Sequence, residues 1–501
     1  MPVNNTHPEY ELMTANWIRA RDVLGGEETI KVAGEKYLPK LEVQSETEYQ
    51  AYKMRASFFN ACARTLAGYV GMIFRKPPYL RLPETNSALG KAMAEFNNDA
   101  DMLGTSLYGY AKQVISEVVS VGRCGTLVDW EQDAESRAYA ALYRAEQILN
   151  WRVERVNGRN IATLLVLHEP EGGERQGTDL FDSVVGEQIR VLRLDRTNGT
   201  DGSNGQRCVV DIWRPKNDQK GNGGKTEWEL AETRIPLRMG KPLPLIPFVF
   251  HGPENSRPTV PRVPLEDIMA MNLTHYRMDA DYKHGLHYTA LPTAWVSGFD
   301  KDAKLQIGSS VAWVAPTAGA TAGFLEFMGQ GLGSFERALD HAERLMAVLG
   351  SRLLEGQKKV AETAEAMQIR QSGEDCILGS MAASVSESIT QVLRWAYWWN
   401  STEEKPDDVT DQQALLDLNT DFSTHGMSAQ EITAVVMAWQ AGAMSQDTMF
   451  ELFRRSEILP DGRGNEEEMG LIGKAKASGK VTSDQLSVTS KPENAQIAAV
   501  K

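Results

Sequence analysis

Metal binding is the first chemistry that the side chains suggest. One predicted helix, at residues 264–287, carries five candidate metal ligands: His275, Asp279, Asp281, His284 and His287. His284 and His287 are three residues apart, so they lie on one face of the helix and could share a metal ion. His275 lies nine residues before His284, which leaves this face without a third ligand. We therefore interpret the histidines as polar or interface residues and predict no metal site.

Phosphate binding is the second possibility, because two segments are rich in glycine. The segment from Gly221 to Thr226, GNGGKT, resembles the end of a phosphate-binding loop. However, Gln219 stands where that motif needs glycine, and a strand-like run follows in place of a helix. We interpret this segment as a hairpin turn. The second run comprises Gly329, Gly331 and Gly333. It lacks the βαβ unit of a dinucleotide site, so we interpret it as a flexible joint before a helix.

Catalysis finds no support in the remaining residues. The sequence contains no GxSxG elbow and no cluster of acids and bases, so we predict no catalytic residue and no cofactor.

The adjacent Lys358 and Lys359 lie in a polar break between two predicted helices. Two interpretations of this pair stay open: a solvated loop, or a loop that touches phosphates in a channel.

Composition limits the class of protein. A chain of 501 residues with 42% hydrophobic residues and a mean hydropathy of −0.37 is expected to form two to four globular domains. The formal net charge of −14 argues against simple electrostatic capture of nucleic acid, although DNA could still slide past such a protein. The four cysteines are far apart, which predicts buried thiols in a reducing compartment. We expect no signal peptide and no transmembrane helix.

The elements that would position these residues are clearest between Pro264 and Asn400. The pattern predicts an amphipathic helix at 264–287, a strand-rich insert at 291–327 and a second helix at 334–355. A polar break from Gly356 leads to a third long helix that ends in an aromatic run: Trp395, Tyr397, Trp398 and Trp399. We interpret this run as core or interface packing. Single helices of this kind cannot bury both sides within one subunit, so neighbouring subunits would supply the missing surface, which predicts an obligate oligomer.

Helices and strands alternate in blocks elsewhere, which indicates an α+β, mostly helical fold. Helices are predicted at 8–24, from Ser45 to Phe74, at 102–121, and at 428–441 and 445–456. Seven short strands between Gly125 and His251 predict one mostly antiparallel sheet region, with a hairpin turn or mobile loop at 195–205. The chain after Leu471 is small and polar, and we expect it to be frayed.

This order of elements resembles that of the portal proteins of tailed bacteriophages. Residues 37–78 and 264–298 are similar to a portal-like family of phages and prophages, and residues 359–374 to the segment after the tunnel loop. The resemblance implies a non-enzymatic protein with the portal fold of wing, stem, clip and crown. The implied parts are 1–262 wing, 263–288 first stem helix, 289–330 clip, 331–355 second stem helix, 356–366 tunnel loop, 367–411 wing helix and linker, 412–475 crown, and 476–501 flexible tail.

The resemblance also implies partners and a location. Portals form a ring of about twelve subunits at one capsid vertex, assembled in the cytoplasm of the host bacterium. The implied partners are double-stranded DNA, the terminase large subunit, the major capsid protein or scaffold and a head-to-tail adaptor, with no membrane. The implied DNA contacts in the tunnel loop are Gln357, Lys358, Lys359 and Glu362. The implied docking residues of the clip are Asp300, Lys301, Asp302 and Lys304.

Two other functions remain as alternatives. One is a different virion component, such as a tail adaptor or a scaffold-like capsid protein. The other is an α+β enzyme with its site in the sheet region around Trp151, His168 and Trp213. The enzyme would need a cluster of perturbed acids and bases in a pocket, and the sequence offers none.

Overall fold

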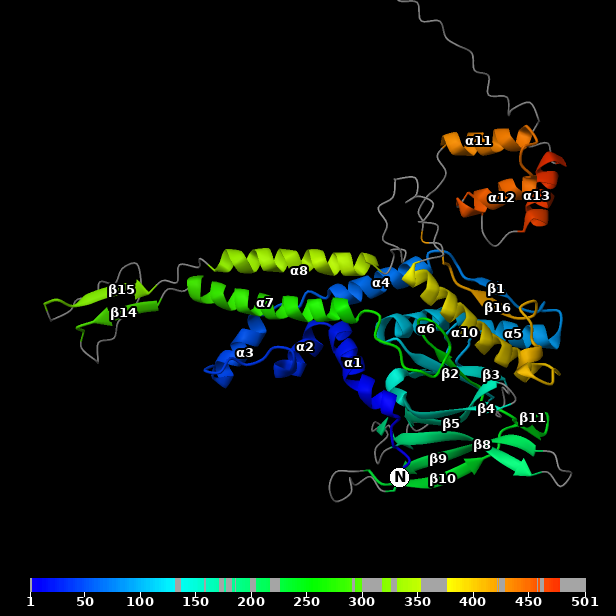
Figure 1. The fold of residues 1–501 in the computed structure, drawn as a ribbon, viewed down its shortest axis with the longest axis horizontal. Helices are drawn as coiled ribbons and strands as arrows, with labels where there is room; N and C mark the ends of the chain where they lie inside the picture. The colour runs from blue at the N-terminus through cyan, green and yellow to red at the C-terminus, as the bar shows by residue number, and fades with distance from the viewer. Residues whose placement is uncertain are drawn as a thin grey trace, which may run out of the picture. The chain divides into compact units, whose positions relative to one another are not determined.

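Figure 1 shows the fold of the protein in a computed structural model. The structure describes residues 2–130, 137–156, 159–170, 175–176, 183–184, 186–198, 204–216, 226–290, 293–299, 318–325, 331–352, 376–420, 422, 429–456, 458–459 and 464–477. The chain divides into two compact units, Met1–Phe422 and Ser423–Lys501, which are described separately below.

Six α-helices of the described chain precede the two main sheets of the first unit. They are α1 (Pro8–Gly25), α2 (Glu27–Ala33), α3 (Glu46–Arg55), α4 (Ala61–Ile73), α5 (Ala88–Asn98) and α6 (Leu107–Val121). Ser45 and Glu48 form a capping box at the start of α3, because the Ser45 hydroxyl accepts from the Glu48 N–H while the Glu48 carboxylate accepts from the Ser45 N–H. Helices α2 and α5 were not predicted. Helix α6 starts after its cap at Ser106, five residues later than predicted at Met102.

The single helix predicted from Ser45 to Phe74 is wrong. The chain leaves the helix after Arg55 and enters α4 at Ala61. Asn60 caps α4 through its side-chain oxygen, which accepts from the Ala63 N–H at 3.0 Å. The buried Asn272 of α7 (Glu266–Ala290) accepts from the next free N–H groups of α4 and donates to the carbonyl of Phe59 at 2.8 Å. The break is therefore held by partners on a distant helix.

The strands form two main antiparallel sheets in place of the single region predicted. The five-stranded sheet has the order β10 (Trp228–Arg234), β9 (Asn204–Pro215), β8 (Glu187–Asn198), β5 (Arg159–Pro170) and β4 (Ile148–Val156). The three-stranded sheet has the order β13 (Phe248–His251), β2 (Cys124–Trp130) and β3 (Ala138–Arg144). Strands β8 and β9 pair up to Asn198 and Asn204, which confirms the predicted hairpin. Strands β9 and β10 are also antiparallel neighbours, as expected for a hairpin connection after Lys216.

Three further pairs of short strands belong to the first unit. They are β1 (Tyr79–Arg81) with β16 (Leu415–Asp417), β6 (Arg175–Gln176) with β7 (Ser183–Val184), and β11 (Leu237–Arg238) with β12 (Lys241–Pro242). The β1–β16 pair joins residues far apart in the sequence and lies beside α10 (Ile377–Asn400) in Figure 1.

Helix α10 passes through the core of the first unit. It contacts β2, β3, β13, α5 and α6, and its aromatic run is buried. The indole N–H of Trp399 donates to the carbonyl of Val128 at 3.2 Å, and the Arg238 guanidinium lies 4.2 Å from the centre of the Trp398 ring. These contacts confirm that the aromatic run packs in the core. All four cysteines are likewise buried and free, as predicted.

The predicted order of the middle third is confirmed. Helix α7 is followed by the hairpin of β14 (Thr293–Ser297) and β15 (Thr321–Leu325), and then by α8 (Leu332–Arg352). The second unit contains α11 (Ala429–Gln440), α12 (Gln446–Arg455) and α13 (Asn465–Ala477). Helix α13 includes Leu471, so the chain stays helical to Ala477, beyond the predicted start of fraying.

Candidate functional site

Helix α7 is the element that links the core to the hairpin, and its first half is buried. Leu265, Ile268, Met269, Leu273 and Tyr276 are buried in the core of the same chain. These residues are therefore buried within their own chain, without a neighbouring subunit. Burial of these side chains fixes the base of α7 firmly to the core.

The middle of α7 is held by polar contacts from α3 and the segment after it. The Ser57 N–H donates to the Asp279 carboxylate at 2.7 Å, and the Tyr52 hydroxyl donates to Asp281 at 2.6 Å. Burial and the hydrogen bond to Asp281 raise the pKa of Tyr52 far above its ordinary value. Arg55 lies 3.2 Å from Nδ1 of His284. Figure 1 shows α7 running on past α3 toward the hairpin.

Helix α8 runs antiparallel beside α7 along its length (Figure 1). The Tyr282 hydroxyl donates to Glu336 at 2.6 Å, and Nε2 of the nearly buried His275 lies 3.4 Å from the Glu343 carboxylate. Gly285 permits a close approach, because a Cβ there would lie 2.9 Å from Leu332. At the other end of α8, the Tyr69 hydroxyl donates to the carbonyl of Gly350. The two helices are therefore anchored at one end and paired at the other.

The exposed surface of α8, which includes the α7 partners Glu336 and Glu343, carries mixed charge. Glu336, Arg337, Asp340, Glu343 and Arg344 are all exposed. Val348 lies among them as an exposed apolar residue. Only Ala342 and Met346 of the described α8 side chains are buried. Alternating charges of both signs would not hold duplex DNA firmly, because its backbone is bound by concentrated lysine and arginine.

The histidines predicted to be polar or interface residues each have partners other than a metal. The ring of His284 contacts Tyr52 and Tyr288 edge-on. Burial is the largest cause that lowers the pKa of His284, and the nearby positive charge of Arg55 lowers this pKa further. His287 also contacts Tyr288 edge-on. Within the described ranges, no three histidine, cysteine or acidic side chains are grouped as metal ligands. The ring contacts of His284 and His287 favour a packing role for these two side chains.

The residues predicted to contact DNA and docking partners lie outside the described residues. These are Gln357, Lys358, Lys359 and Glu362 in the predicted tunnel loop, and Asp300, Lys301, Asp302 and Lys304 in the predicted clip. Their roles stay predictions. What the structure places is the pair of helices and the hairpin that flank them in the sequence.

The residues of the alternative enzyme site are engaged in separate contacts. Trp151 stacks on His7 at 4.0 Å between ring centres, and the buried guanidinium of Arg123 lies 3.9 Å from the centre of its ring. His168 lies 3.6 Å from Glu187 across β5 and β8, and Trp213 packs against a small cluster on the sheet. These contacts do not assemble an acid and a base around a pocket.

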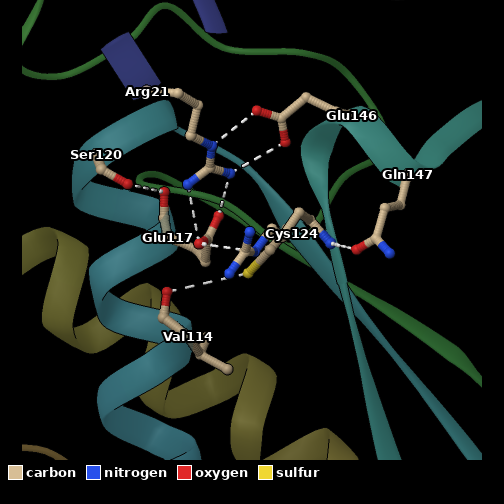
Figure 2. Close-up of polar contacts among 8 residues, drawn as sticks. Arg21, Val114, Glu117, Ser120, Cys124, Glu146 and Gln147 are labelled. Atoms are coloured by element: carbon tan, nitrogen blue, oxygen red, sulfur yellow. Dashed lines mark hydrogen bonds and ion pairs between the residues drawn. The ribbon is translucent and has the colours of Figure 1, made fainter. Parts of the chain in front are cut away.

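Sequence reasoning missed a clamp of charged residues that joins α1 to the core. Figure 2 shows Arg21 between two carboxylates, with four hydrogen bonds of 2.6–3.0 Å to Glu117 and Glu146. Although burial acts to lower the pKa of Arg21, the hydrogen bonds to Glu146 and Glu117 raise it overall. Glu117 and Glu146 lie 96 and 125 positions after Arg21 in the sequence, so no local pattern could have revealed these contacts.

A second missed feature is a chain of hydrogen bonds through the buried His251. The Ser388 hydroxyl donates to the carbonyl of Val385, so it must accept from Nδ1–H of His251 at 2.7 Å. Nε2 is then an acceptor, and it receives the Thr126 hydroxyl at 2.6 Å, which in turn accepts from Tyr110. Burial lowers the pKa of His251 to about 3. The neutral ring thus joins α6, β2, β13 and α10.

A cavity of about 700 Å³ lies next to this network, at the base of the helix pair. Its lining includes His251, Pro264, Leu349, Ile377 and Met381, from β13, the start of α7, α8 and α10. Charged residues of both signs surround it, among them Arg257 and Glu266.

No helix in the described parts of the chain is long and apolar enough to cross a membrane.

Comparisons with known proteins give one family match and several similar structures. A family described as a domain of unknown function (DUF4055) matches residues 264–400, which extend from the start of α7 through α10. No curated protein matches the chain. Similar chains occur in solved structures of gene transfer agent (GTA) particles.

The structural similarities extend over most of each chain at low sequence identity. A chain in "Virion of native gene transfer agent (GTA) particle" is 10% identical, with a TM-score of 0.36, over 84% of this chain and 97% of that chain. A chain in "Neck of empty GTA particle computed with C6 symmetry" is 11% identical, with a TM-score of 0.36, over 78% and 88%. TM-scores of this size are too low to support an inference about function.

Proposed function

We propose that this chain is the subunit of a portal ring in a phage-like particle, through which double-stranded DNA enters and leaves the capsid. The observation that carries the proposal is the α7–α8 pair. Leu265, Ile268 and Met269 at its base are buried in the core, and α8 pairs with α7. Paired helices that are anchored at one end suit subunits that pack around a common axis.

The dimensions and charges of the pair fit this role. Helix α7 has 25 residues, which corresponds to roughly 37 Å at about 1.5 Å per residue. The exposed face of α8 mixes acidic and basic side chains, and the whole chain has a net charge of −14. A channel wall of this kind would let DNA slide, because it offers no continuous basic surface to bind phosphates.

The other parts of the chain take portal roles on this proposal. The α7–α8 pair is the stem, the hairpin between the helices belongs to the clip, and the sheets with the N-terminal helices and α10 form the wing. The second unit is the crown. Gln357, Lys358, Lys359 and Glu362 would face the DNA, and Asp300, Lys301, Asp302 and Lys304 would contact the terminase and later a head-to-tail adaptor. The major capsid protein or scaffold would contact the wing.

Particle mass and shape test the proposal directly. The purified chain of 55.5 kDa should assemble into a closed ring whose mass is about twelve times that of the subunit, with an axial hole in negative-stain images. A chain that stays monomeric over a wide concentration range would contradict the proposal. A closed particle without an axial hole would contradict it as well.

A further inference from the structure

The end of the α7–α8 pair is an uncharged tip, formed by the described residues of 285–299 and 318–325. These residues include the last turn of α7 and both strands of the β14–β15 hairpin. None of them is a lysine, arginine, aspartate or glutamate. Four large apolar side chains are exposed there: Leu286 at 39%, Tyr288 at 43%, Trp295 at 46% and Phe324 at 52%.

The two aromatic residues of the hairpin lie on opposite faces. Trp295 pairs with Gly323, and Ala294 pairs with Phe324. Paired residues share one face of an antiparallel ribbon, and successive residues alternate between its faces. The indole of Trp295 lies over Gly323, where a Cβ would be 2.9 Å from the indole nitrogen. Trp295 therefore covers one face, and Phe324 projects from the other.

A hairpin of this composition needs a covering partner. An isolated two-stranded hairpin is marginally stable in water, and proteins usually protect exposed strand edges with charged residues. The described strands TAWVS and TAGFL have no such protection. A surface with the same uncharged, aromatic character would fit best.

The position of the aromatic residues on two opposite faces selects the kind of contact. A twofold dimer uses the same face of both copies, so it would cover one aromatic residue and leave the other in water. A head-to-tail contact covers both, because each copy offers one face to the copy before it and the opposite face to the copy after it.

We propose that the β14–β15 hairpins of neighbouring copies stack face to face, so that Trp295 of one copy packs on Phe324 of the next. This inference rests on the proposed ring and identifies a surface that closes it. The occupant of each face is a second copy of this chain.

Pairwise cross-linking tests the contact. Trp295→Cys and Phe324→Cys variants, coexpressed and treated with a bismaleimide that spans the roughly 10 Å between stacked strands, should form a cross-linked dimer, whereas neither variant alone should. The native cysteines are buried and should not contribute. Lys241→Cys, on the exposed β11–β12 pair, replaces Trp295→Cys in the control and should give no dimer with Phe324→Cys. A dimer of Trp295→Cys alone would overturn the head-to-tail contact.

The outcomes separate this inference from the proposed function. If the wild-type chain forms a ring but the mixed cysteine variants do not cross-link, the hairpin contact is wrong and the ring stands. If the wild-type chain is monomeric, both are wrong. In addition, Trp295→Ala should weaken ring assembly roughly tenfold or more, whereas Trp295→Phe should retain most of it. Equal assembly of Trp295→Ala and the wild type would also overturn the contact.

Discussion

The side-chain oxygen of Asn272 on α7 lies 3.1 Å from the backbone nitrogen of Ala61, the first residue of α4. The same amide accepts from Cys62 and donates to Phe59, so one buried side chain satisfies three backbone groups where the chain turns between α3 and α4. Asn272 is therefore one of the residues that join the long helix of the proposed stem to the N-terminal helices, together with Asp279 and Asp281.

Replacing Asn272 by alanine should lower the free energy of unfolding by about 1–3 kcal/mol, because buried backbone groups lose their partners. Urea denaturation of the purified protein measures this change. Asn86→Ala is a matched control, since Asn86 is exposed and bonds only the Glu84 side chain in the described contacts; we expect a change within about 0.5 kcal/mol. Equal stability of Asn272→Ala and the wild type would show that the amide contributes little.

Replacing Arg21 by alanine should also destabilise the protein, by roughly 2–3 kcal/mol, because Glu117 and Glu146 would face each other without their shared cation. Arg262→Ala provides the control. Arg262 also pairs with a glutamate, Glu266 at 3.2 Å, but its side chain is 82% exposed, so its loss should have a small effect. Similar losses for the two variants in thermal or urea denaturation would refute the special role of the clamp.

His251 should make the protein sensitive to acid. Its folded pKa is lowered by burial to about 3 from an ordinary value of 6.5, so the unfolded chain binds a proton between these values while the folded chain does not. The contribution of neutral His251 to the free energy of unfolding is therefore complete above pH 6.5 and is lost as the pH falls toward 3. The expected loss is roughly 4–5 kcal/mol.

A His251→Gln variant isolates this contribution from that of the carboxylates. The difference in unfolding free energy between the wild type and the variant should shrink as the pH is lowered from 7 toward about 4. A difference that stays constant over this range would mean that His251 is not the group responsible. Folding of the variant at neutral pH can be checked by circular dichroism.

Charge reversal at Lys358 and Lys359 tests the predicted tunnel loop. Replacing both by glutamate should impair packaging or retention of DNA more than ring assembly, because the variant would repel passing phosphates. Lys91→Glu with Lys241→Glu makes the same change in net charge at two exposed positions and serves as the control. Packaged DNA is measured by nuclease protection, and ring assembly by negative stain. An equal loss of both activities would contradict the role in the tunnel.

The amino-acid sequence determined the elements whose signals are local. The apolar stripes predicted α7, α8 and α10 in the right order, and the Ser45–Glu48 capping box marked the start of α3. The aromatic run near Trp398 was correctly assigned to packing. Such features depend on residues within a few positions of each other, so the pattern of side chains records them directly.

Tertiary structure decided the rest, because the groups that matter are distant in the chain. The stretch from Ala56 to Asn60 contains no glycine or proline, and it leaves the helix because Asn272 and Asp279 of α7 bind its backbone. Strand β3, AYAALYR, has no β-branched residue and is a strand because β2 pairs with it. Local sequence reports which conformations a segment favours, whereas burial and hydrogen-bond partners on distant elements determine which one is stable.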